Sequence, residues 1–192
     1  MAVLFVAAVA ACTTSPTPSP RITPVPSLGG ETPGPTDTAP AGATYIPNLT
    51  IEGVLAAAQA AGLSCLSEPE SASGGATLYQ LICSVDNAVS GYGFVLTADY
   101  WTLDRISQLH VLANPLGGAP DPATSQAVLS GLFLIALAEP DRQAAATWYA
   151  THDGDTACQP CVQTYGDSSV ELQASATPGS AAITVHGIAI VP

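Results

Sequence analysis

The chain has 192 residues, and its three Arg, absent Lys and 15 Asp or Glu give it a net charge of −12 at neutral pH. This balance excludes the phosphate-neutralising surface that nucleic-acid binding needs, and it makes anionic lipid headgroups poor partners for the folded part. Only 9% of the residues are charged and 47% are hydrophobic, a composition that supports a packed domain.

The chain opens with an uninterrupted apolar run, AVLFVAAVAA, at residues 2–11, which Cys12 follows directly. The run is about half as long as the ~20 residues that a membrane-spanning helix needs, and its small residues before the cysteine are typical of a secretory signal. The stretch VAAC, residues 9–12, resembles the lipobox of bacterial lipoproteins, in which the cysteine after the cleavage site carries a lipid.

This resemblance covers only the first dozen residues. It implies a signal peptide at residues 1–11, lipid attachment at Cys12, and a location on the extracytoplasmic face of the cell membrane. The membrane is then a partner through the lipid on Cys12. An ordinary secretory signal with an incidental cysteine is the alternative.

Residues 12–47 have the composition of a linker. From residue 13 onward they hold nine Pro and eleven Ser or Thr, with few apolar side chains to bury. We therefore expect a lipidated Cys12 followed by a disordered linker that holds the folded part about 30 to 110 Å from the membrane.

The remaining residues, 48–192, are expected to form a single domain. An apolar stripe with helical spacing begins after Thr50 and ends at Gly62, a residue type favoured just beyond the end of a helix. Strand-like segments follow, separated by turn-forming sequences such as SASGG and DNAVSG, which predicts an antiparallel meander. The four predicted strands are residues 63–68, 77–85, 92–98 and 106–112.

Two helices and two strands are expected in the second half. Asp121 and Pro122 are a helix start, the apolar run 127–138 predicts a buried helix, and Pro140 begins another that stops before Gly154. Alternating apolar residues then predict strands within 168–175 and 182–191. This order predicts an α+β fold, a two-layer sandwich with helices packed on one face of an antiparallel sheet.

Four cysteines lie beyond the linker, and an even number in an exported domain favours disulfides. Cys65 and Cys83 each lie nine residues from Gly74 in the SASGG turn, so a simple hairpin would bring them together across two strands. This leaves Cys158 and Cys161, in the sequence CQPC, to form the second disulfide.

The CQPC sequence also has the form of the thioredoxin-like redox motif, so a thiol-disulfide oxidoreductase using Cys158 and Cys161 is the alternative function. In that motif a helix starts at the first cysteine and lowers its pKa. Here polar, turn-like residues precede Cys158 and a strand-like VQTYG follows Cys161, which favours a structural disulfide. A zinc site with His152 would lack a clear fourth ligand.

No catalytic motif such as GxSxG, a Walker loop or HExxH is present. The three histidines, at positions 110, 152 and 186, have no sequence neighbours that would make any of them a site, and a strand histidine such as His110 is most often a surface or core residue. We expect no metal and no cofactor.

One stretch, ADYWTLD at residues 98–104, has the composition of a recognition site. Tyr100 and Trp101 lie between Asp99 and Asp104, and flat rings beside acceptors are the mix that sugar and peptide sites use. Trp101 in the core is the alternative.

Together these features predict a non-enzymatic domain, anchored by lipid in the cell envelope, with a binding or accessory role toward an unknown envelope ligand or protein. A structural protein whose acidic surface faces wall polymer or divalent ions is a third possibility.

Overall fold

The computed structural model describes residues 38–71, 77–87, 91–117 and 120–191. The predicted signal peptide, Cys12 and most of the predicted linker lie outside these residues.

Most of the described strands form one antiparallel sheet of seven strands, in the order β2-β3-β4-β5-β8-β7-β6. The first four form the meander expected from the sequence, and the last three form a second meander whose strand β8 pairs with β5. The strands are β2 (Ser64–Ser71), β3 (Thr77–Asn87), β4 (Tyr92–Thr102), β5 (Arg105–Pro115), β6 (Cys161–Tyr165), β7 (Ser168–Ala174) and β8 (Ala181–Gly187).

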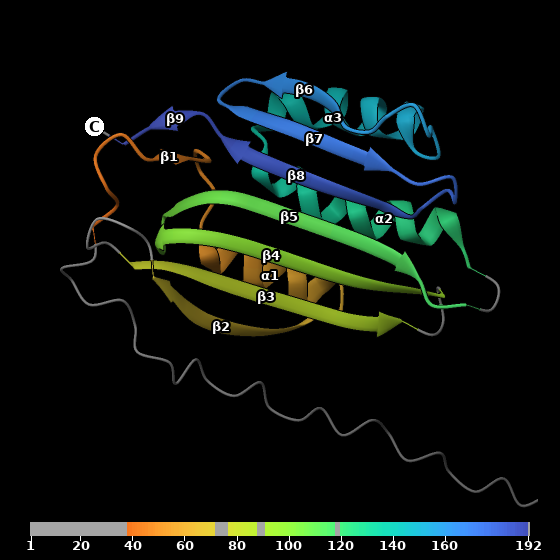
Figure 1. Cartoon of the computed structure of the whole chain (residues 1–192), viewed down its shortest axis with the longest axis horizontal. Coiled ribbons are helices and arrows are strands. Elements are labelled where there is room, and N and C mark those ends of the chain that lie inside the picture. Colours follow the sequence, from red (N-terminus) through yellow and green to blue (C-terminus); the bar gives the residue numbers. More distant parts are fainter. Residues whose placement is uncertain (1–37, 72–76, 88–90, 118–119, 192) are drawn as a thin grey trace, which may run out of the picture.

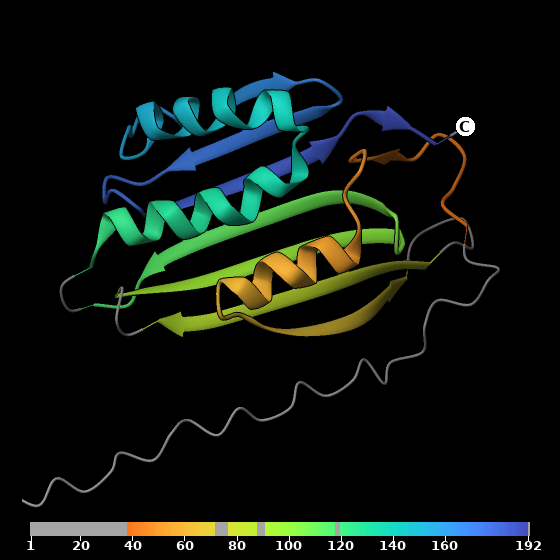
Figure 2. The same cartoon turned by 180° about the vertical axis from the view of Figure 1, so that it is seen from behind.

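Three α-helices accompany the sheet: α1 (Ile51–Ala60), α2 (Pro122–Phe133) and α3 (Glu139–His152). The mixed α+β class expected from the sequence is therefore confirmed. Figure 1 looks onto the sheet with the helices behind it, and Figure 2, from the opposite side, has all three helices in front.

Local sequence explains where these helices begin. The Thr50 side chain caps α1 by accepting a hydrogen bond from the backbone N–H of Gly53 at 3.1 Å. The Asp121 side chain caps α2 by accepting from the backbone N–H groups of residues 123 and 124, and Pro122 occupies the first helical position.

The core is built from buried residues of the helices and from alternate residues of the strands. Along β4, buried residues alternate with partly exposed ones, and β7 and β8 follow the same period of two. The largest fully buried side chains are Tyr92, Tyr149, Phe94, Phe133, Ile46, Leu81, Leu96, Ile106, Leu109, Leu129, Leu132 and Leu172. We call the opposite side, where the partly exposed residues of each strand lie, the open face.

Residues that precede position 48 also take part in the described fold. The segment Thr44–Tyr45 forms a short strand, β1, which pairs with β9 (Ala189–Ile190) near the C-terminus. The Ile46 side chain is completely buried, and its backbone N–H donates to the carbonyl of Ile106 at 2.7 Å. The end of the proline-rich segment is therefore part of the core.

Two elements in the second half of the domain differ from the expectation. The apolar run predicted as a helix over 127–138 leaves α-helical geometry after Phe133 and continues as a 3-10 turn, η1 (Leu134–Ala136). The second half also contains β6, which the expected order of elements lacked. No helix in the described part of the chain is long and apolar enough to cross a membrane.

Candidate functional site: the open face of the sheet

The sheet register brings titratable side chains together on the open face. Asp99 of β4 lies opposite Gln108 of β5, and Gln108 lies opposite His186 of β8. The next residue of β5 on the same face, His110, lies opposite Thr184, and Thr184 lies opposite Glu171 of β7. We call the four titratable residues the open-face cluster; its members, Asp99, His110, His186 and Glu171, occupy four consecutive strands and are all partly exposed.

His110 is the central member of the cluster. Its Nδ1 lies 2.9 Å from the hydroxyl oxygen of Thr184, a hydrogen bond that fixes the orientation of the ring. Burial lowers the pKa of His110 below the ordinary value of 6.5, and the electrostatic influence of His186 acts in the same direction. The carboxylates of Asp99 and Glu171 oppose the shift without reversing it. His110 is thus neutral at neutral pH.

Amide side chains hold both carboxylates of the cluster. The Asp99 carboxylate accepts a hydrogen bond from Nε2 of Gln80 at 2.9 Å, and the Glu171 carboxylate accepts one from Nε2 of Gln173 at 3.3 Å. Because hydrogen bonding restricts these side chains, the open face carries two fixed negative charges beside two imidazoles.

The lowered pKa of His110 predicts a loss of stability in mild acid. The unfolded chain takes up this proton more readily than the folded chain, so stability is complete above about pH 6.5 and is lost as the pH falls through the folded pKa. We expect His110→Gln to weaken the fall in urea midpoint between pH 7.5 and pH 5. The matched control is His152→Gln, on α3. An undiminished pH dependence in the His110 variant would refute the assignment.

The structure separates two residues of the predicted ADYWTLD site. Its first five residues, 98–102, belong to β4, so Asp99 lies on the open face and Tyr100 points to the opposite side. Tyr100 is only 4% exposed and stacks on Tyr79 with ring centroids 5.5 Å apart. The Tyr100 ring therefore packs in the core and does not share a surface with Asp99.

The other two residues of that stretch lie at the end of the strand. Trp101 is partly exposed and sits where β4 and β5 lose register, and its indole N–H is buried without an acceptor in the structure. The Asp104 carboxylate accepts from the Thr102 hydroxyl at 2.7 Å and pairs with Arg105 at 3.3 Å, which secures the turn between the strands.

Both expected disulfides are present. Cys65 and Cys83 lie directly opposite each other on β2 and β3 and are bonded, as are Cys158 and Cys161. Cys158 is completely buried, in a turn between the end of α3 and the start of β6, and Cys161 is the first residue of that strand. No helix begins at Cys158, so this pair lacks the helix N-terminus that lowers thiol pKa values in thioredoxin-like motifs.

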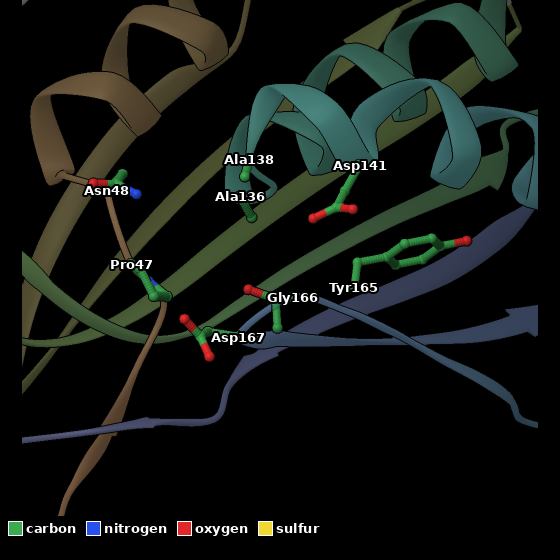
Figure 3. A pocket seen from close by; sticks show the side chains of 9 residues that line it. Pro47, Asn48, Ala136, Ala138, Asp141, Tyr165, Gly166 and Asp167 are labelled. Atoms are coloured by element: carbon green, nitrogen blue, oxygen red, sulfur yellow. The ribbon is translucent and has the colours of Figure 1, made fainter.

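A small hollow of about 120 Å³ lies on the helix side, beside the β6–β7 turn. Figure 3 shows the carboxylates of Asp141 and Asp167 at this hollow, with the hydroxyl end of Tyr165 directed away from Pro47. Burial and the nearby Asp141 raise the pKa of Tyr165. The hollow draws its lining from three separate segments, so no local motif in the sequence indicated it.

Among the described residues, no three His, Cys, Asp or Glu side chains are grouped so that they could already hold a metal ion. Comparisons with protein-family models, with curated protein sequences and with solved structures found no match to the chain.

Proposed function

We propose that this protein is a lipid-anchored domain on the extracytoplasmic face of a bacterial cell membrane, where it has a non-enzymatic binding or accessory role. The observation that carries the proposal is the use of cysteine. The four cysteines of the described residues form two disulfides, so that of the five in the sequence only Cys12, in the lipobox-like VAAC, is left for lipid attachment.

The disulfides support an extracytoplasmic location. Such bonds form and persist outside the reducing cytosol, in the compartments that an N-terminal export signal leads to. The apolar run at residues 2–11 and the paired cysteines are independent features of the chain, and both favour export.

The open face supports a binding role. It combines carboxylates, imidazoles, amides and hydroxyls with apolar side chains such as Leu66 and Val162, which are 67% and 58% exposed. Such mixtures of directional polar groups and apolar contact are what recognition surfaces use. We propose that the partner is an envelope ligand or protein that contacts this face.

The lipid anchor is tested by labelling growing cells with an alkyne analogue of palmitate. We expect the full-length protein to incorporate the label and to fractionate with membranes. Cys12→Ala should abolish labelling and release the protein from the membrane, because the lipid would be attached through a thioether at this cysteine. Ser15→Ala, close by in the same segment, is the matched control. Unchanged membrane retention of the Cys12 variant would contradict the proposal.

The alternative function, a thiol-disulfide oxidoreductase, has one favourable feature, the partly exposed Cys161. The other cysteine of the pair counts against it. An attacking thiolate must be accessible, whereas Cys158 has no exposed surface and its sulfur faces the carbonyl of Leu172 at 3.7 Å. A structural disulfide at the start of β6 accounts better for this geometry.

We also propose that the domain is a two-layer sandwich, with the helices covering one face of the sheet. The alternation of buried and partly exposed residues along β4 and β8 supports this arrangement, since a sheet covered on both faces would bury both sets. Lysine substitutions of Leu96 and Thr97, on the two faces of β4, test it.

A further inference from the structure

The two histidines of the open-face cluster are diagonal neighbours on adjacent strands. His110 of β5 lies opposite Thr184, and His186 of β8 lies opposite Gln108, so the two imidazoles are one step apart on the same face. Figure 1 shows β5 and β8 side by side near the middle of the sheet. Diagonal side chains of this length are within reach of each other.

We propose that His110 and His186 bind a divalent transition-metal ion, Cu²⁺ or Zn²⁺, on the open face. Imidazole nitrogen is a preferred ligand for both ions. Both side chains are partly exposed, so an ion can approach them from solvent.

The environment of His110 resembles that of metal-binding histidines. Such residues usually use one ring nitrogen for the metal and the other for a hydrogen bond that sets the orientation of the ring. The hydrogen bond between Nδ1 of His110 and the Thr184 hydroxyl occupies the first nitrogen and leaves Nε2 for the ion.

The two carboxylates of the cluster supply the matching charge. Asp99 is a diagonal neighbour of His110, and Glu171 is a diagonal neighbour of His186, so a negative charge flanks the imidazole pair on each side. No third ligand of the described residues is already in place, so water completes the coordination. The carboxylates contribute by attracting the cation.

Cationic side chains of the described residues are engaged elsewhere. Arg105 pairs with Asp104 and lies over the ring of Tyr45, and Arg142 pairs with Glu139. Neither neutralises the carboxylates of the cluster, so their attraction for a divalent cation is retained.

This inference names a ligand for the face on which the proposed function places its partner, but it does not depend on the lipid anchor. The test therefore uses the full-length chain carrying Cys12→Ser, which removes the proposed attachment site and the one thiol outside the two disulfides. A failure of palmitate labelling would refute the lipid anchor but not metal binding. A failure of metal binding would refute this inference but not the lipid anchor.

The experiment is titration of this protein with Cu²⁺ alone, monitored by calorimetry and electron paramagnetic resonance, and a second titration with Zn²⁺ alone, monitored by calorimetry. We expect one site with nitrogen coupling from two imidazoles. His110→Gln and His186→Gln should each weaken binding by about tenfold or more. Glu171→Gln should weaken it by a few fold.

The chain holds only one other histidine, His152 on α3, whose Nδ1 lies 2.8 Å from the carbonyl of Trp148. His152→Gln is thus the matched control and should bind the ion unchanged. Circular dichroism of each variant verifies that it is folded. Absence of binding to both ions, or an equal loss on substituting His152, would overturn the proposal.

Discussion

Leu96→Lys is expected to prevent folding, whereas Thr97→Lys, at the next position of β4, leaves the domain stable. Leu96 has no exposed surface and lies opposite Cys83 and Val111 in the core. An unpaired charge buried there costs roughly 4 kcal/mol or more, out of a total stability of about 5–15 kcal/mol for a typical domain.

Thr97 lies on the open face, partly exposed beside His110. A lysine at this position extends into solvent, and we expect the free energy of unfolding to change by about 0.5 kcal/mol or less. Urea denaturation followed by circular dichroism measures both variants. Equal destabilisation by the two substitutions would mean that both faces of β4 are covered, contrary to a two-layer arrangement.

The second large effect is expected from the disulfide between β2 and β3. Replacing Cys65 and Cys83 together by Ala should lower the free energy of unfolding by about 3 kcal/mol, because the bond closes a loop of 18 residues and restricts the unfolded chain. Replacing both cysteines together leaves neither partner of this bond behind as an unpaired thiol. Urea denaturation without reductant gives the difference.

The disulfide between Cys158 and Cys161 provides the comparison. It closes a loop with a sequence separation of only three residues, so the same double replacement by Ala should remove about 2 kcal/mol. If removing the Cys65–Cys83 disulfide left the free energy of unfolding unchanged, the hairpin would be held by the sheet alone.

The sequence predicted those parts of the fold whose signal is local. Alternating residues and turn-forming sequences marked the central strands, and capping residues such as Thr50 and Asp121 marked helix starts. The Cys65–Cys83 pairing followed from the symmetry of the two cysteines about Gly74. Each of these inferences uses residues that are close together in the chain.

Features that depend on distant segments were not predicted. The pair β1 and β9 joins two-residue strands from opposite ends of the described chain, too short for any periodicity to be detected. For β1 and β9, tertiary pairing rather than local preference makes the strand. β6 differs, because VQTYG was recognised as strand-like but was left out of the expected order of elements; it is an edge strand with largely exposed residues and lacks the apolar alternation of a covered strand.

The open-face cluster illustrates the same limit for the candidate site. Asp99 and Glu171 lie far apart in the sequence, and the cluster exists because β8 pairs with β5 after three intervening helical segments. No motif in the sequence links His110 to His186. The prediction of a recognition site in ADYWTLD, by contrast, assumed that neighbours in sequence share one surface. Strand alternation instead directs Tyr100 into the core.

The most direct test of the proposed function is mass spectrometry, without reductant, of the protein extracted from membranes of the producing cells. We predict an N-terminal peptide that begins at Cys12 and carries a lipid, together with one peptide pair joined through Cys65 and Cys83 and a closed Cys158–Cys161 bond. An unmodified Cys12, or a disulfide between Cys12 and any of the other four cysteines, would contradict the account.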